Sequence, residues 1–483
     1  MKKLPLLCLG LLAGCTVGPN YGGAPRVASD AVTRGTFVRA QDPAFNAAPG
    51  LTRWWEALGD PTLTALVDDA LAHSPQIDRA QATIREARAQ LRTQQVNQLP
   101  SVSASASYLH AKIPDVNIAG TSGSAQGGTS TNTSFDFYNL GGTASWEPDL
   151  FGGGRRGAES ARATVAERFA DLADAQVSLS AEVAQAYVNL RDVQHRAALN
   201  AQSTKLQTQA LALTRQRYAA GTATALDVER LQNQLNQTDA QNLPLGAQID
   251  EYRNQLAVLT GRAPGALDAT LVVVVPVPLP PASVPISDPG TLIAHRPDVR
   301  SAERALAAGT AQIGVQTAKM YPRISFTGIL GLGGTAIGDV VNPNKFTALL
   351  APQLSWSFLD FGRNRAMVRQ AQAQRDEAEA QYRQTVLSAL QDAENSLSQF
   401  GNRRQQLAQL VEAERSAQRS AQLNALRVQA GTSTVTDQLD IERQRYAATI
   451  SVAQATAQLT NSYIAVQKAL GLGWSDPSAA AAR

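Results

Sequence analysis

The sequence predicts an α+β protein made of two copies of one unit, each with a β-hairpin and a long helical hairpin. Three observations lead to this fold class. The same motifs recur in the same order along the 483 residues, short segments alternate apolar and polar residues, and two long segments contain no proline. A repeat of about 200 residues is far longer than solenoid periods of ~20–50 residues, so a whole architectural unit is duplicated.

The duplication keeps an almost constant register. Pro75 matches Pro297 and Pro100 matches Pro322 at an offset of 222, whereas Trp146 matches Trp356 at an offset of 210. The insertion that accounts for this difference falls within residues 103–145 of the first copy. We expect it in the loop of residues 118–134, which is rich in Gly, Ser and Thr, because surface loops tolerate insertions.

Each copy begins with helices and continues into two strands. A proline starts a helix in each copy, at residues 76–97 and 298–319, since proline suits the first helical turn. Strands with period-two alternation follow near residues 101–108 and 135–146, and near 323–330 and 346–358. One apolar and one polar face fits an outer-membrane sheet. A soluble sandwich would give the same alternation, so the pattern alone leaves both open.

The longest elements are helices. Residues 155–219 and 363–429 are rich in Ala, Gln, Glu, Arg and Leu, and in the first of them apolar positions recur at spacings of three and four. Such a heptad seam predicts lengthwise packing against neighbouring helices. We expect Gly221 and Gly431 to end these helices in the left-handed conformation, and helices over residues 225–260 and 435–470 to run back.

The first residues indicate export. Lys2 and Lys3 precede an apolar stretch, and small residues follow before Cys15, as in a bacterial lipoprotein signal peptide. Cys15 would then be the lipidated mature N-terminus. The alternative is an ordinary signal peptide with an incidental cysteine. The formal net charge of +3 gives no indication of nucleic-acid binding.

Nothing in the sequence indicates an enzyme. The four histidines are scattered without metal-ligand spacing, and Gly152-Gly153-Gly154 runs into arginines where a phosphate-binding loop needs Lys-Ser or Lys-Thr. We therefore expect no catalytic residue, no metal and no cofactor other than a covalent lipid on Cys15.

Several separated motifs carry a family resemblance. They are the segment from Cys15 to Tyr21, Trp54-Trp55 followed by Asp60-Pro61, Leu150-Phe151-Gly152, and the run from Arg296 to Glu303. On these motifs the chain resembles the TolC/OprM outer-membrane efflux channels, and among them the NodT-type outer-membrane factor lipoproteins of RND tripartite efflux systems.

The resemblance implies a TolC-like homotrimer located in the outer membrane and extending into the periplasm of a Gram-negative cell. Four strands per chain are too few to close a barrel, so three chains would share a 12-stranded outer-membrane β-barrel, continued by a periplasmic α-helical coiled-coil barrel. Its partners would be a periplasmic adaptor (membrane fusion) protein, an inner-membrane RND-type transporter and outer-membrane lipid.

The implied function is a passive exit duct for drugs or other small toxic solutes. Export of peptides or proteins by type I secretion is one alternative, and a structural coiled-coil lipoprotein is another.

The expected organisation follows the repeat. It comprises a signal peptide (1–14), a lipidated extended segment (15–61), repeat one (62–265, with a β-hairpin at about 101–147), a Pro-rich linker (266–288), repeat two (289–472, with a β-hairpin at about 322–358) and a disordered tail (473–483).

The hairpin turns are the expected functional site. Each turn contains a pattern that resembles a capping box, Thr224 with Asp227 and Thr434 with Asp437. For Asp227 the sequence supports this structural role and a role in gating equally. By resemblance, Asp437 and Asp440 would form rings of carboxylates at the periplasmic gate, selecting cations and raising one another's pKa. The other expected gate residues are Thr436, Arg443, Asp227 and Arg230, and the expected adaptor contacts are Ala220, Gly221, Thr222, Ala430, Gly431 and Thr432.

Overall fold

The computed structural model describes residues 16–113 and 133–474. The chain divides into two compact units: residues 1–24, 86–165 and 304–379 form unit 1, and residues 25–85, 166–303 and 380–483 form unit 2. The predicted signal peptide, Cys15, most of the loop at 118–134 and nearly all of the C-terminal tail lie outside the described residues.

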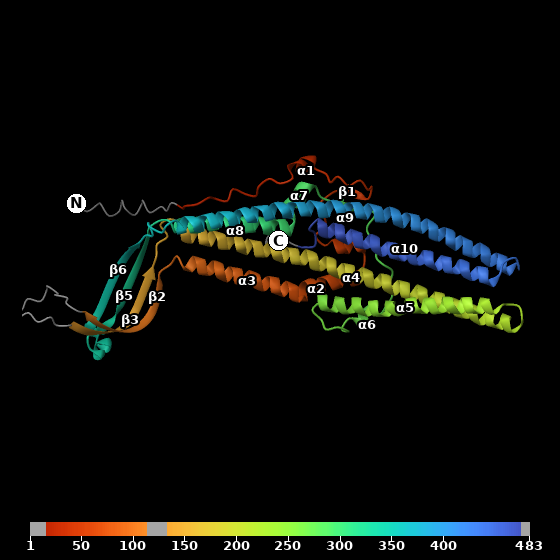
Figure 1. Cartoon of the computed structure of the whole chain (residues 1–483), viewed down its shortest axis with the longest axis horizontal. Coiled ribbons are helices and arrows are strands. Elements are labelled where there is room, and N and C mark those ends of the chain that lie inside the picture. The colour runs from red at the N-terminus through yellow and green to blue at the C-terminus, as the bar shows by residue number, and fades with distance from the viewer. Residues whose placement is uncertain (1–15, 114–132, 475–483) are drawn as a thin grey trace, which may run out of the picture. The chain divides into compact units, whose positions relative to one another are not determined.

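Unit 1 contains a four-stranded antiparallel sheet in the order β2-β3-β5-β6 (Figure 1). The strands are β2 (Ser101–Ile113), β3 (Thr133–Trp146), β5 (Arg323–Gly334) and β6 (Phe346–Ser355). Each copy thus supplies one hairpin, as predicted, and β3 of the first pairs with β5 of the second. The short helices η3 (Ile337–Val341) and η4 (Pro343–Lys345) connect β5 to β6.

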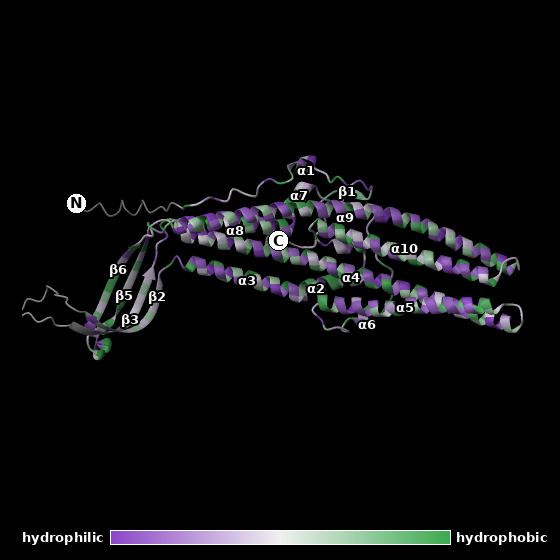
Figure 2. Cartoon of the chain, in the orientation of Figure 1, coloured by the Kyte–Doolittle hydropathy of each residue, from purple (hydrophilic) through white to green (hydrophobic). Residues whose placement is uncertain are grey.

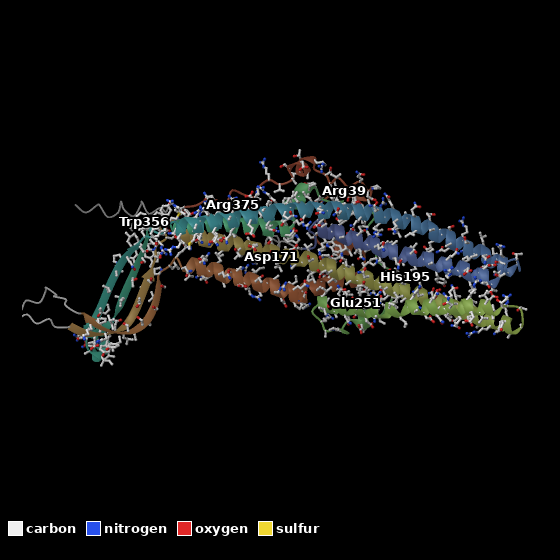
Figure 3. The ribbon with its side chains drawn as sticks, in the orientation of Figure 1. Arg39, Asp171, His195, Glu251, Trp356 and Arg375 are labelled. Carbon is white, nitrogen blue, oxygen red and sulfur yellow. The ribbon has the colours of Figure 1, made fainter. Side chains whose placement is uncertain are left out.

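The second hairpin corrects the sequence-based strand limits. We expected the last strand to reach Phe358, but β6 ends at Ser355. The Trp356 indole instead donates to the Met320 carbonyl at 3.1 Å. Figure 3 places Trp356 where the sheet gives way to α9. The residues between β6 and α9 therefore form an elbow, although their alternation continues that of the strand.

The sheet has one apolar face and one face of mostly small and polar residues, on which Ile329 and Leu349 also lie. Val102, Ala144, Gly328 and Leu350 lie in one row across the four strands, and Ser101, Ser145, Thr327 and Ala351 lie in the next, on the other face. The apolar face is open: Val102 is 76% exposed and Leu350 70% exposed. Because the side-chain period is two, this register fixes which face each residue occupies.

Helices of unit 1 adjoin the sheet. They are parts of α3 (Pro75–Val96), α4 (Gly153–Ala219), α8 (Pro297–Ala318) and α9 (Arg363–Gln429). The buried Arg156 of α4 holds the N-terminal segment, donating to the Val17 carbonyl at 3.2 Å, the Gly18 carbonyl at 3.3 Å and Asn20 Oδ1 at 2.6 Å. The chain immediately after the predicted lipidation site is thereby fixed to the helical part of this unit.

Unit 2 contains the two helical hairpins, α4 with α5 (Ala225–Leu259) and α9 with α10 (Val435–Ala469). The predicted heptad seam is confirmed in its second half, where Leu179, Val183 and Leu190 are fully buried. In Figure 2 hydrophilic and hydrophobic residues are interspersed along these helices. None of the described helices is long and apolar enough to cross a membrane.

The remaining elements of unit 2 surround the hairpins. The N-terminal segment predicted as extended contains α1 (Ser29–Arg34), β1 (Phe45–Ala47) and η2 (Trp54–Leu58), whose two tryptophans are buried. Then follow α2 (Pro61–His73), α6 (Asp268–Leu271), β4 (Val284–Ile286) and α7 (Pro289–His295), and β4 pairs in parallel with β1.

The Pro-rich linker is held by backbone contacts to two long helices. Arg191 and Gln194 of α4 donate to the carbonyls of Val273 and Leu271, at 2.6 and 2.7 Å, and Thr460 of α10 donates to the Pro278 carbonyl at 2.7 Å. The linker is therefore packed along the helices of this unit.

Candidate functional site: the tips of the helical hairpins

The two hairpin turns have the same backbone construction, and Figure 1 shows them at the same end of unit 2. Gly221 has φ +72° and Gly431 has φ +73°, the left-handed conformation that favours glycine. The next amide, of Thr222, reaches back to the Arg217 carbonyl at 2.8 Å, and that of Thr432 reaches the Arg427 carbonyl at 2.9 Å. Each helix thus ends in a Schellman motif, and the predicted glycine caps are confirmed.

A capping box starts the returning helix in each copy. The Thr224 hydroxyl donates to Asp227 Oδ2 at 2.7 Å and the Thr224 amide does so at 3.0 Å. In the second copy Thr434 makes the same contacts with Asp437, at 2.7 and 3.2 Å. These hydrogen bonds, from the threonine side chain first and its amide second, lower the pKa of both carboxyl groups.

Asp227 and Asp437 occupy equivalent places in the two capping boxes. From the sequence we expected capping and gating equally for Asp227, and we expected Asp437 to line the gate. In the structure both are N-terminal capping residues with matching partners, and their roles in gating stay predictions. The expected rise in pKa concerned a ring of three chains. Within one chain the hydrogen bonds to Asp437 act in the opposite direction, so its carboxylate is held in the charged form.

Asp440 is placed differently. It lies one turn further along α10 with its side chain 59% exposed, and Oδ1 is 3.8 Å from Nε of Arg443, whose side chain is 56% exposed. Thr436 and Arg230 are also exposed. The six expected adaptor contacts, Ala220–Thr222 and Ala430–Thr432, are all exposed at the turns. Their roles in gating and adaptor binding stay predictions.

The second turn has a polar network that the sequence interpretation missed. Asn424 of α9 is 5% exposed; its Oδ1 accepts from the Ser433 hydroxyl at 2.8 Å, and its Nδ2 donates to Gln438 Oε1 at 2.8 Å. At the equivalent places the first copy has Thr214, Ala223 and Val228. Side chains therefore tie the second turn to both of its helices through hydrogen bonds that these residues of the first copy cannot reproduce.

Further from the turns, side-chain hydrogen bonds join the two helices of each hairpin, and one of them lies at the same place in both copies. In the first copy the Thr204 hydroxyl donates to Asp239 Oδ1 at 3.3 Å, and in the second the Thr449 hydroxyl donates to Glu414 Oε1 at 2.8 Å. Thr204 and Glu414 are equivalent positions of the two copies, and so are Asp239 and Thr449. The acid and the hydroxyl have therefore exchanged helices between the copies.

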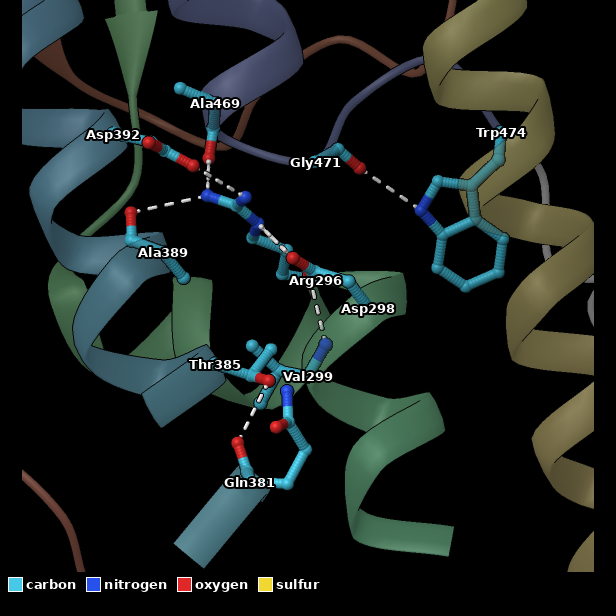
Figure 4. Close-up of polar contacts among 10 residues, drawn as sticks. All are labelled: Arg296, Asp298, Val299, Gln381, Thr385, Ala389, Asp392, Ala469, Gly471 and Trp474. Carbon is cyan, nitrogen blue, oxygen red and sulfur yellow. Dashed lines mark hydrogen bonds and ion pairs between the residues drawn. The ribbon is translucent and has the colours of Figure 1, made fainter. Parts of the chain in front are cut away.

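Arg296, in one of the motifs that carried the resemblance, joins three helices of unit 2 (Figure 4). Its Nε lies 2.9 Å from Asp298 Oδ1, Nη1 donates to the carbonyls of Ala389 in α9 and Ala469 in α10 at 3.1 and 2.9 Å, and Nη2 donates to Asp392 at 3.0 Å. The guanidinium thus fixes the start of α8 against α9 and the end of α10. Ser74 stands at the equivalent position of the first copy.

Comparison with known proteins decides the family. The family model described as "Outer membrane efflux protein" matches residues 66–262 and 289–472, which together are well over half of the chain. The chain belongs to the outer membrane efflux protein family. The predicted resemblance is confirmed, and this efflux protein is an outer-membrane channel, the exit duct of an efflux pump, reaching into the periplasm.

Individual relatives are similar along nearly their whole length. The pyoverdine export outer membrane protein OpmQ of Pseudomonas aeruginosa is 30% identical over 482 residues, covering 98% of this chain and 97% of the relative. Nodulation protein T of Rhizobium leguminosarum bv. trifolii is 28% identical, with 96% of each chain covered. Among solved structures, the outer-membrane channel OprN superposes with a TM-score of 0.85 at 34% identity, covering 95% of this chain and all of that one.

OpmQ is named for export and OprN for an outer-membrane channel, and none of these relatives is named for an enzymatic activity. Within the described residues of the efflux protein, no three His, Cys, Asp or Glu side chains are grouped so that they could hold a metal ion.

Proposed function

We propose that the efflux protein is a homotrimer that conducts small solutes through a shared barrel and a shared helical tunnel. The supporting observation is the four-stranded sheet, whose β2 and β6 edges lack a partner strand among the described residues. About eight strands are needed to enclose a barrel, and three such sheets supply twelve. The exposed apolar face would meet lipid, and the face of Ser, Thr and Gly would line a wet lumen.

The proposed partners are a periplasmic adaptor at the hairpin tips and an inner-membrane RND-type transporter that supplies the energy. Relatives named for pyoverdine export, toluene efflux and antibiotic efflux support a cargo of drugs or other small toxic solutes. The efflux protein itself would be a passive duct without enzymatic activity or cofactor. Type I secretion of peptides and a purely structural coiled-coil role are the alternatives that conductance and cargo assays separate.

We assign the lipid anchor to Cys15. The residues that follow support this assignment, because the Val17 amide donates to the Phe151 carbonyl at 3.1 Å and Arg156 holds the next residues. The anchored end would thus leave the protein beside the start of α4. Mass spectrometry of the mature N-terminus tests it, since an unmodified Cys15 would contradict the assignment.

Asp440 is the main candidate for a residue that lines the gate. Threefold symmetry would turn its exposed carboxylate into a ring that attracts cations and repels anions. Arg443 would limit the charge of this ring, since it lies beside Asp440, and Thr436 and Asp437 would position it by starting α10. The equivalent residue of the first copy is Arg230, so the two copies carry opposite charge at this level of the tip.

Planar-bilayer recording tests the duct and the gate together. We expect the wild-type protein to conduct ions, and Asp440→Ala, alone or with Asp437→Ala, to raise conductance and weaken cation selectivity. Asp227→Ala is the matched control for a lost capping box, because it removes the same contacts from the first copy. A protein that conducts nothing would contradict the duct, whereas unchanged conductance and selectivity in Asp440→Ala would remove this residue from the gate.

A further inference from the structure

Unit 1 has a hollow of about 190 Å³ between the first elbow (residues 147–152), which joins β3 to α4, and the junction of α8 with β5. The apolar residues that line it are Leu150, Phe151, Val315, Ala318 and Pro322. The charged residues that line it are Glu147, Asp149, Lys319 and Arg323. The apolar residues are buried or half-buried, whereas Glu147, Lys319 and Arg323 are exposed. The hollow therefore has an apolar floor and a charged rim.

The described part of the chain begins beside this hollow. Cα of Thr16 would lie 2.8 Å from a Cβ built on Gly152, so Thr16 packs directly on the first elbow. The Val17 amide donates to the carbonyl of Phe151, which lines the hollow, at 3.1 Å. Backbone contacts thus fix the start of the N-terminal segment at the elbow.

The direction of the N-terminal segment also leads toward the hollow. A Cβ built on Gly18 would lie 2.5 Å from Cα of Gly314, so Gly18 lies directly on α8. Ala318 follows one turn later on α8, in the lining of the hollow, and a Cβ built on Gly153 would lie 3.0 Å from its Cβ. Going back from Gly18 to Thr16, the chain therefore runs from the middle of α8 toward the elbow.

We propose that the hollow binds an acyl chain of the lipid that Cys15 carries. The proposal rests on the lipid anchor assigned above and adds where that lipid lies on the protein. Consecutive Cα atoms are about 3.8 Å apart, so a lipid on Cys15 starts within a few ångströms of Thr16. The hollow has room for about six groups of ~30 Å³, the volume of one water molecule in the liquid. It therefore covers the first methylene groups of a chain and not its whole length.

The floor and the rim both suit this ligand. Burying methylene groups against the apolar floor removes them from water, which is favourable for each group. At the rim, the Lys319 ammonium and the Arg323 guanidinium are exposed donors, and the ester and amide carbonyls of a lipid are acceptors. Because β5 begins at Arg323, the remainder of the chain would continue along the apolar face of the sheet into the membrane.

The second elbow (residues 356–362) also has a hollow, but the N-terminal segment does not cover it. Trp356, Phe358 and Phe361 are among the residues that line this second hollow. No described atom outside the elbow lies within 4 Å of a Cβ built on Gly362, the residue equivalent to Gly152. The contacts of Thr16 and Val17 therefore select the hollow at the first elbow for the lipid.

Photo-cross-linking from the lipid tests the proposal on the full protein. Cells that produce the protein are fed a palmitic acid analogue with a diazirine near its carboxyl end, and the irradiated protein is digested and analysed by mass spectrometry. We expect the N-terminal lipopeptide to be joined to peptides that contain Phe151 or Val315. The yield should be several-fold above that for peptides that contain Val102 or Leu350, on the open apolar face of the sheet.

Two variants are matched for size and differ in place. Val315→Trp fills the hollow and should lower the yield of these cross-links several-fold, whereas Val102→Trp, on the open face, should leave it unchanged. Lipidation of Cys15 and helical circular dichroism should match the wild type in both. A folded Val315→Trp protein that cross-links like the wild type would overturn the proposal, and the wild-type cross-links decide the question if this variant does not fold.

The same spectra separate the possible failures. An unmodified Cys15 would contradict the lipid anchor of the proposed function. A lipidated Cys15 whose acyl chain joins only the open face of the sheet or free lipid would keep the anchor and overturn its site in the hollow. Peptides of the hollow joined to a free phospholipid, and not to the lipopeptide, would show that a membrane lipid occupies the hollow and would also overturn the proposal.

Discussion

Replacing Arg296 with serine, the residue that the first copy has at this place, should loosen the end of α10. The guanidinium side chain is 13% exposed and bonds two carboxylates and two carbonyls. Hydrogen bonds to a charged group contribute about 1.5–3 kcal/mol each, but they are not additive. The Asp392 side chain is 55% exposed, so its ion pair adds little. The bonds to Asp298, Ala389 and Ala469 therefore contribute most, and for their loss we expect a local cost of about 2–4 kcal/mol.

Hydrogen exchange measures this loss where it occurs. The amides of Leu470 and Leu472 bond to Val466 and Gln467 at the end of α10, and their exchange reports opening of that end. Since about 1.4 kcal/mol corresponds to a tenfold change, exchange in Arg296→Ser should accelerate by roughly 30-fold to several hundred-fold.

Two controls define the outcome of this experiment. Arg296→Lys keeps the charge but loses the planar fork, and should give an intermediate acceleration. Amides around Thr260 and Gly261, at the equivalent place in the first copy, should not change. Exchange within about threefold of the wild type at Leu470 and Leu472 would refute the reasoning, because a guanidinium that contributes less than about 1 kcal/mol cannot be fixing this joint.

Three further predictions follow from particular contacts. In denaturant titrations Gly261→Ala should destabilise the protein by several kcal/mol, since φ is +71° and the new Cβ would lie 2.4 Å from the His73 carbonyl. Gly221→Ala, with φ +72° and open space around the new Cβ, should cost only about 1 kcal/mol. Equal losses of stability in the two variants would contradict this reasoning. Burial first, and then the hydrogen bond to Asp60, raise the pKa of Tyr187 to about 12. The stability that this tyrosine contributes below about pH 10 should therefore be lost between about pH 10 and 12. Tyr187→Phe should flatten that part of the stability profile, and an unchanged profile would show that Tyr187 does not cause the loss. Because hydrogen bonds from Thr434 lower the pKa of Asp437, the cap that this carboxylate forms should persist above about pH 4 and be lost as the pH falls further. The helix content of the tip, followed by hydrogen exchange, should therefore be constant from about pH 5 to 8. A change within that range would show that another group sets the stability of the tip.

The regular elements were predictable because local residues set their ends. Proline begins α3 and α8, and Gly221 and Gly431 end α4 and α9, so the observed helix limits lie within two residues of those predicted. The limit of β6 was wrong because alternation continues through Trp356 and Phe358, although these residues belong to an elbow. The short elements of the N-terminal segment depend on contacts with distant parts of unit 2, and no period in the sequence indicates them.

The site was predictable only where it is local. The capping boxes are visible as Thr-x-x-Asp in both copies, and both were predicted correctly. The network around Asn424 joins residues from two helices and a turn, and the partners of Arg296 lie far along the chain, in α9 and at the end of α10. A motif can mark Arg296 as important, but only the packing of three helices supplies its partners.

The exchanged acid and hydroxyl of the two hairpins bear on how the copies diverged. Two successive amino-acid substitutions convert a pair such as Thr204–Asp239 into a pair such as Glu414–Thr449, and either position can change first. One intermediate would face two carboxylates across the hairpin and repel, while the other would face two threonines, which still hydrogen-bond. Of these two intermediates, only the uncharged one keeps a hydrogen bond between the helices at this place. A threonine pair introduced in either hairpin should accordingly leave the protein able to fold.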